Sequence, residues 1–337
     1  MSARIHLASH LSLLACLVLV LSTSLFTSVV AGESRLDLYS PFTLKTEDDS
    51  LYIPFISKSC PIASMPDSDN WLQWVNYYRA TACLPPVTEN ATWSAGDYKH
   101  AIYIVKNDEL QHSEDSSNQW YTPEGLSAAQ RSNLAASYNV NASDRWAVDT
   151  WMQAPFHALG IIDPQVTVVG YGSYREADGG FEMGAALDIL SGGGQTPQTE
   201  FPGIWPGSGT TVPALPHWGE YPSPLTSCPG YNGQTGLPVI LQIGSGELTP
   251  AVSATSFAHD AQPLEHCVFD ETNYSNPDAV QQSLGRSILN AHDAIVLIPR
   301  IPLSAGTPYT VSVAVNGQTY TWSFSVSESP WASEVQD

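Results

Sequence analysis

The sequence predicts an α+β protein with helices and a small antiparallel sheet in its N-terminal part and an all-β sandwich in its C-terminal part. Between residues 69 and 190, apolar residues recur at helical spacing and are followed by two strand-like runs. The composition then changes at Ser191-Gly-Gly-Gly194, which opens a stretch dense in Pro, Gly, Ser and Thr. From residue 237 onwards, short alternating runs are separated by turn residues. We therefore expect two domains joined by a linker over residues 191–236.

The first predicted helix illustrates the N-terminal pattern. Trp71, Trp74, Val75 and Tyr78 recur at i, i+3, i+4 and i+7, so they form one apolar face behind a cap at Ser68 or Asp69. The other expected elements, in chain order, are a helix from Ser94, a helix opening at Thr122-Pro123-Glu124, a helix over 147–152 that Pro155 ends, and strands over 166–172 and 181–190.

The C-terminal part contains a strong hairpin signal. Residues 308–315 and 319–326 alternate in polarity around Asn316-Gly317, a pair that tolerates the positive φ angles of a type I′ turn. Further strands are expected over residues 237–243, 251–258, 265–269 and 294–299. Several short strands at this spacing favour an Ig-like or fibronectin-like β-sandwich over residues 237–327, followed by a tail over 328–337.

The N-terminus is typical of an export signal over residues 1–31. Arg4 precedes an apolar run from Leu11 to Leu21, and Val29-Val-Ala31 provides small residues for cleavage. A transmembrane anchor is the alternative, but serines and a threonine interrupt the apolar run before it reaches the ~20 residues that a spanning helix needs. We expect a secreted, extracellular or cell-surface protein that does not span the membrane, with an N-terminal extension over residues 32–68.

The cysteines that remain after cleavage form an even set, which favours disulfides over metal ligation because the sequence has no CxxC spacing. Pairing by proximity joins Cys60 to Cys83 and Cys228 to Cys267, one bridge in each expected domain. The sequence alone also allows the other two connectivities.

The charge restricts the possible partners. A formal net charge of −21 with only 12 Lys and Arg residues produces a negative field that repels phosphate backbones, so we expect no nucleic-acid partner. Acidity without a block of like charges is typical of a solvated surface, with cation binding as the alternative.

Four segments carry a resemblance to a known family. They are an aromatic helix from Trp71 to Arg79, the turn Leu110-Gln-His112-Ser-Glu114, the run Trp151-Met-Gln-Ala-Pro-Phe-His157, and the strand end at Val168-Val-Gly-Tyr-Gly172. Their order resembles the CAP superfamily, which comprises cysteine-rich secretory, antigen 5 and pathogenesis-related proteins and is also called SCP-like. The resemblance implies a CAP-type α-β-α sandwich over residues 69–190.

The resemblance also implies a cleft in which two histidines meet two glutamates. His112 and His157 match the histidines, and the implied site would hold zinc or another divalent metal through them. The glutamate positions differ, because Ser132 and Gln153 stand where the family has carboxylates. Glu114 and Glu124 are the candidates that would replace them. The competing interpretation is that His112 hydrogen-bonds a turn and His157 fills a core position.

The family's functions favour a non-catalytic extracellular role in which the cleft binds a lipid, glycan or protein, without a required cofactor. Aromatic residues expected in loops, namely Trp120, Trp205 and Trp218, offer further contacts to such ligands. The alternative is a metal-dependent hydrolase that uses His112 and His157 with Glu114 or Glu124 as general base. A purely structural N-terminal domain is the third possibility.

Overall fold

A computed structural model describes residues 60, 63–197, 199–217, 219–306 and 308–328 of the chain. These residues belong to one unit that runs from residue 51 to residue 337. The expected signal peptide, most of the N-terminal extension, Trp218 and the tail beyond Glu328 lie outside the described residues.

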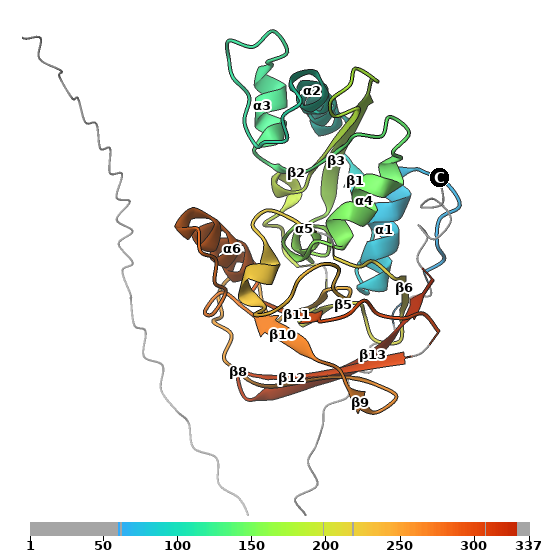
Figure 1. Cartoon of the computed structure of the whole chain (residues 1–337), viewed down its shortest axis with the longest axis vertical. Coiled ribbons are helices and arrows are strands. Elements are labelled where there is room, and N and C mark those ends of the chain that lie inside the picture. The colour runs from blue at the N-terminus through green and yellow to red at the C-terminus, as the bar shows by residue number, and fades with distance from the viewer. Residues whose placement is uncertain (1–59, 61–62, 198, 218, 307, 329–337) are drawn as a thin grey trace, which may run out of the picture. The chain divides into compact units, whose positions relative to one another are not determined.

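Helices cover both faces of a four-stranded N-terminal sheet (Figure 1). Its spatial order is β1 (Thr88–Glu89), β3 (Val168–Arg175), β4 (Met183–Asp188) and β2 (Ser132–Ser137); β1 runs parallel to β3 and the other pairs are antiparallel. The helices are α1 (Trp71–Thr81), α2 (Ala91–Asn107), α3 (Pro123–Ala129), α4 (Asp144–Met152) and α5 (Pro155–Ile161). This arrangement confirms the expected mixture of helices and sheet.

Successive residues of β3 point to opposite faces of the sheet, so neighbouring side chains contact different helical layers. The Tyr171 ring stacks on Trp71 of α1, with ring centroids 5.0 Å apart, and also contacts Trp151 of α4. The next residue, Gly172, faces α2, where a Cβ atom would lie 2.0 Å from the backbone nitrogen of Tyr98. Glycine is therefore required here for α2 to pack closely on the sheet.

Two helix boundaries differ from the sequence prediction. The second helix begins at Ala91, before Ser94, because the Asn90 side chain caps it by accepting from the backbone N–H groups of Thr92 and Trp93. Pro155 lies at the first position of α5, where its missing N–H costs no hydrogen bond. The proline was expected only to end the preceding helix.

The described residues of the C-terminal part form two sheets and one α-helix. The first sheet has the order β10 (His266–Phe269), β11 (Ala294–Pro299), β7 (Val239–Gln242) and β5 (Gly203–Trp205). The second has the order β6 (Thr211–Pro213), β13 (Gln318–Ser327), β12 (Pro308–Val315), β8 (Val252–His259) and β9 (Gln262–Pro263). Asn316 and Gly317 join β12 to β13 with φ angles of 50° and 75°, as the hairpin signal predicts. The sheets are consistent with a β-sandwich; its assignment as Ig-like stays a prediction.

Two features of the C-terminal part had no counterpart in the prediction. Helix α6 (Ala279–Ala291) follows β10 and precedes β11 in the sequence, and the side chain of Asp278 caps it. The Pro/Gly-rich segment over residues 191–236 contributes β5 and β6, one strand to each sheet. Trp205, which we expected in a loop, is fully buried in β5 and donates from Nε1 to Thr81 Oγ1 at 3.2 Å.

One hydrophobic core joins the helices to the C-terminal sheets. It contains Trp74 and Trp151 from the helices together with Trp205, Ile240 and Trp322 from the strands. The two disulfides join Cys60 to Cys83 and Cys228 to Cys267, as proximity predicted. Among the described residues, the helices are too short or too polar to cross a bilayer.

Candidate functional site

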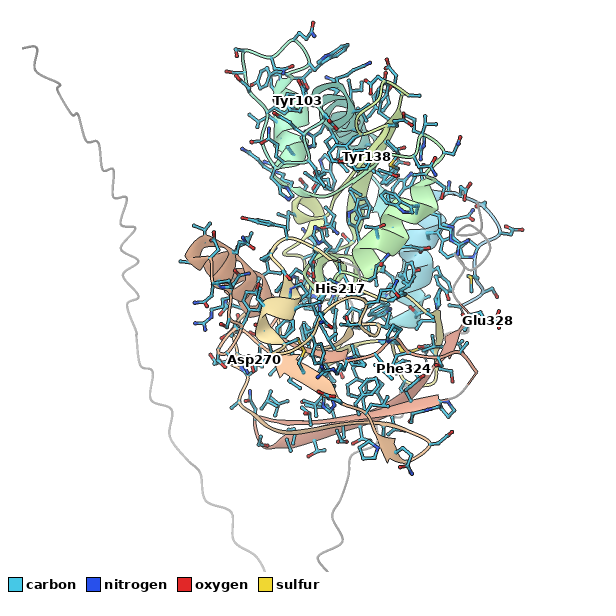
Figure 2. The ribbon with its side chains drawn as sticks, viewed as in Figure 1. Tyr103, Tyr138, His217, Asp270, Phe324 and Glu328 are labelled. Atoms are coloured by element: carbon cyan, nitrogen blue, oxygen red, sulfur yellow. A yellow bond between two sulfur atoms is a disulfide. The ribbon has the colours of Figure 1, made fainter. Side chains whose placement is uncertain are left out.

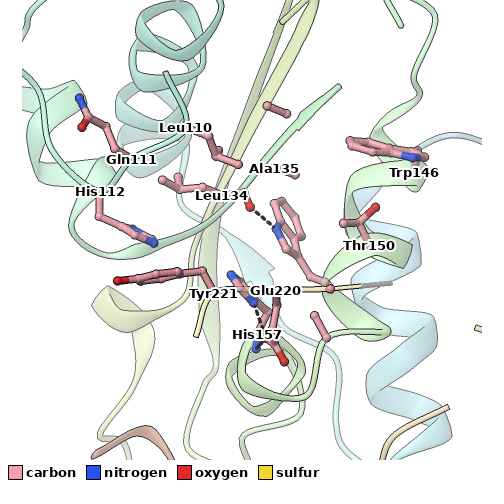
Figure 3. A pocket seen from close by; sticks show the side chains of 14 residues that line it. Leu110, Gln111, His112, Leu134, Ala135, Trp146, Thr150, His157, Glu220 and Tyr221 are labelled. Carbon is pink, nitrogen blue, oxygen red and sulfur yellow. Dashed lines mark hydrogen bonds and ion pairs between the residues drawn. The ribbon is translucent and has the colours of Figure 1, made fainter. Parts of the chain in front are cut away.

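A cavity of about 510 Å³ opens among β2, α4, the start of α5 and the loop after α2 (Figure 3). Most of its walls are apolar. The lining residues are Leu110, Gln111, His112, Leu134, Ala135, Ala136, Trp146, Thr150, Trp151, Ala154, His157, Gly219, Glu220 and Tyr221. The structure thus brings the two candidate histidines to one cavity, although 44 residues separate them in the sequence.

His112 reaches the cavity from the loop that follows α2. Its Nδ1 lies 2.7 Å from the backbone oxygen of Ala129. A carbonyl oxygen only accepts, so Nδ1 carries the proton, and in the neutral ring Nε2 keeps its lone pair. Burial lowers the pKa of His112 below its usual value, and the charge of nearby His157 lowers it further. A neutral His112 therefore offers an acceptor to the cavity.

His157 lies on the first turn of α5 and is held by a glutamate. Its Nδ1 lies 2.8 Å from Oε2 of Glu220, whose side chain is only 1% exposed (Figure 3). The same carboxylate accepts from the backbone N–H groups of Phe156 and His157 at 3.2 and 3.3 Å. Glu220 thus caps the N-terminus of α5 and fixes the proton of His157 on Nδ1. When the ring is neutral, Nε2 of His157 is the second acceptor that faces the cavity.

Glu220 belongs to a short segment whose described residues are 217 and 219–221, and we call these residues the strap. His217 anchors the strap between the helices and the C-terminal sheets, where its Nδ1 donates to the backbone oxygen of Gln153 at 2.9 Å (Figure 2). Sequence reasoning missed Glu220 because it lies in the Pro/Gly-rich segment, far from the family motifs. The available signal was that Glu200 and Glu220 are the only charged residues between 191 and 236.

The two glutamates predicted to serve the site lie outside the cavity lining. Glu114 is buried, contacting Nδ1 of His100 at 2.9 Å and accepting from the backbone N–H of Thr122 at 3.0 Å. Glu124 is in the first turn of α3, with 62% of its side chain exposed, and forms an ion pair with Lys99. Their oxygens satisfy these local partners, and Glu220 is the carboxylate that reaches the cavity.

The pair of His100 and Glu114 positions the loop that carries His112. Nε2 of His100 lies 3.1 Å from the backbone oxygen of Gln111, so this nitrogen donates. Nδ1 faces a carboxyl oxygen, and one proton must lie between those two atoms for a hydrogen bond to form. Burial lowers the pKa of His100, against the opposing effect of Glu114. The pair thus connects α2 to both Gln111 and Thr122, on either side of His112.

Ser132 and Gln153, which stand where the CAP superfamily has glutamates, make other contacts in this structure. Ser132 is buried in β2 and donates from Oγ to Oδ1 of Asp97 at 2.7 Å. Burial raises the pKa of Asp97 to about 8, and the charge of Asp188 contributes. Gln153 caps α4 and holds the strap through its backbone oxygen. Neither Ser132 nor Gln153 lines the cavity.

The site residues do not fit a zinc centre of the kind expected. No group of three or more His, Cys, Asp or Glu side chains in the described part of the chain is arranged to hold a metal ion. His112 and His157 supply two nitrogens, whereas a catalytic zinc site has three protein ligands. The Glu220 oxygens already accept three N–H groups.

Comparison with known proteins agrees with the resemblance in the sequence. Residues 72–187 match the model of the cysteine-rich secretory protein family, CAP. A similar solved structure is that of an extracellular protein containing an SCP domain from Bacillus anthracis str. Ames, with 17% identity and a TM-score of 0.28. The match covers 35% of this chain and 38% of that protein. Comparison with curated proteins gives no match.

Proposed function

We propose that this chain, whose residues 72–187 match the CAP family model, is a secreted binding protein that takes an apolar ligand into the cavity beside the strap. The observation that carries the proposal is a mainly apolar cavity of about 510 Å³ into which two oriented imidazoles face. Small-molecule sites combine these features, with apolar walls for affinity and a few polar groups for orientation. The two disulfides support an oxidising, extracellular location.

Among the ligand classes that we expected, a lipid-like molecule fits the cavity best. The walls are formed by side chains such as Leu110, Leu134 and Trp151, which gain free energy when an apolar body displaces water. The metal-dependent hydrolase is not favoured by the described residues, because Glu114 and Glu124 lie elsewhere and the ligand set for a metal is incomplete.

A fluorescence titration tests the binding proposal. The neutral dye N-phenyl-1-naphthylamine brightens in apolar surroundings, and we expect saturable binding to the wild-type protein. Ala136→Trp fills the cavity and should weaken dye binding at least about tenfold, which is a loss of about 1.4 kcal/mol. Ala254→Trp is the matched control, because it adds the same side chain at an exposed position of β8. Equal dye binding by both variants would contradict the proposed cavity.

Calorimetric titration with zinc separates the binding proposal from the hydrolase alternative. We expect no saturable heat from the wild-type protein beyond that of the double variant His112→Ala/His157→Ala, since two imidazoles alone make an incomplete zinc site. Saturable zinc binding that the double variant loses, together with peptide or ester hydrolysis lost in parallel, would overturn the binding proposal in favour of the hydrolase.

A further inference from the structure

The two imidazoles of the cavity share one property, which is that each has its Nδ1–H engaged and offers Nε2 as a hydrogen-bond acceptor when the ring is neutral. His112 and His157 each use Nδ1–H on an acceptor outside the cavity, Ala129 O and Glu220 Oε2 respectively. Their Nε2 atoms therefore face the cavity as lone pairs when the rings are neutral. A ligand group that meets them must donate.

The charges of the lining also favour a ligand group that donates hydrogen bonds and carries positive charge. Its fourteen residues include neither Lys nor Arg, and Glu220 is the one carboxylate among them. Burial lowers the pKa of His112, which keeps that ring neutral. Protonation of His157 would only neutralise Glu220, 2.8 Å away. The lining is thus negative or neutral in either state of His157, within a chain of net charge −21.

Aromatic rings also belong to the lining of the cavity. Trp146 and Tyr221 line the cavity, and Tyr221 is 62% exposed. Figure 3 shows the Tyr221 ring next to His112, on the strap side of the cavity. The faces of Trp and Tyr rings attract cations and repel anions. Acceptor lone pairs, a carboxylate and aromatic faces together form the surroundings that a cation with N–H donors requires.

We infer that the ligand of this cavity is an apolar molecule with an ammonium head group, an inference that rests on the proposed binding function. The ammonium supplies donors for Nε2 of His112 and His157, and its charge is balanced by Glu220 behind His157. The apolar body lies against Leu110, Leu134 and Trp151. A carboxylate head would bring only acceptors to the two Nε2 acceptors, and a second negative charge to the cavity that Glu220 lines.

Displacement of the bound dye by three amphiphiles with ten carbon atoms each tests this inference. Decylamine, decanol and decanoate are compared below their micelle concentrations at about pH 7, where the amine is charged and the acid ionised. We expect decylamine to displace the dye at a concentration at least about tenfold lower than decanoate, with decanol between them. Preference for decanoate, or equal displacement by all three, would overturn the inference while the proposed binding function stands. Failure of the dye itself to bind would count against the binding function.

Two cavity variants and one control variant outside the cavity assign the preference to the local charges. Glu220→Gln removes the carboxylate and should weaken decylamine several-fold relative to decanol. Glu124→Gln makes the same change in net charge on an exposed side chain outside the cavity, so it should alter the ratio by less than about twofold. Thr150→Lys places a cation in the lining and should shift the preference towards decanoate even if Glu220→Gln folds poorly. A ratio unaffected by both cavity variants would refute the inference.

Discussion

Asp97 provides a direct test of how burial controls a carboxyl group in this fold. The residue is fully buried on α2, where the Ser132 hydroxyl donates to its Oδ1 at 2.7 Å. Burial raises its pKa from 3.8 to about 8, and the charge of Asp188 adds to this. The native protein therefore holds a proton that the unfolded chain releases. The contribution of Asp97 to stability is fully present below pH 3.8 and is lost as the pH rises towards 8.

The change Asp97→Asn removes this titration and keeps the size of the side chain. Between about pH 5 and pH 7, the wild-type protein should lose about 3 kcal/mol of unfolding free energy relative to the variant, because each pH unit in this range changes the difference by more than about 1 kcal/mol. Urea unfolding at several pH values, followed by tryptophan fluorescence, measures the difference. Asp67→Asn is the control, because Asp67 is exposed.

Parallel pH profiles for the wild type and Asp97→Asn would show that Asp97 is ionised in the native state at pH 5. The reasoning from burial would then be wrong. A difference confined to the region above pH 7 would also contradict the raised pKa, since the unfolded chain already releases the proton near pH 4.

Three further changes test the supports of the site. His100→Ala leaves the buried Glu114 carboxyl without its imidazole partner and should lower the unfolding free energy, measured in urea, by about 3–5 kcal/mol. Hydrogen exchange should also show faster opening of residues 109–114. Unchanged exchange would contradict the proposed positioning role. Gly172→Ala places a methyl group 2.0 Å from an α2 backbone nitrogen and should lower the unfolding free energy by about 1–3 kcal/mol or more, so a thermal midpoint equal to that of the wild type would refute the close packing. Cys228→Ser/Cys267→Ser opens the bridge across 39 residues and should cost about 2–5 kcal/mol, whereas an unfolding curve insensitive to reductant in the wild type would show that the bridge does not stabilise the fold.

Local patterns predicted the elements that carry strong periodicity or turn chemistry. Helix α1 buries Trp74 and Tyr78 in the protein core, as the predicted stripe requires. The Asn316-Gly317 pair forms the hairpin turn between β12 and β13. Helix α6 was missed although Val280, Leu284 and Ile288 recur at i, i+4 and i+8 behind a cap at Asp278, which is the pattern of an amphipathic helix. Strand β2 was missed because Ser132 was assigned to a family motif, while in the structure it pairs with Asp188 of β4.

The site was predictable only where its residues lie inside those motifs. His112 and His157 stand at motif positions, and both line the cavity. The role of Glu220 depends on a contact across 63 residues, which neither periodicity nor spacing encodes. Glu114 was placed in the site because it neighbours His112 in the sequence, yet its side chain turns to His100. Adjacency along a loop does not determine which way a side chain points.

The origin of the strap has a consequence for how such proteins are compared. The family match ends at residue 187, and the carboxylate that orients His157 stands 33 residues later. Within residues 72–187, Ser132 and Gln153 stand at the positions expected to hold carboxylates, so this segment alone would indicate a cleft without acidic groups. A fragment that stops at the end of that segment would expose the first turn of α5 and leave one imidazole free to rotate. A comparison confined to residues 72–187 would therefore overlook the carboxylate that holds His157.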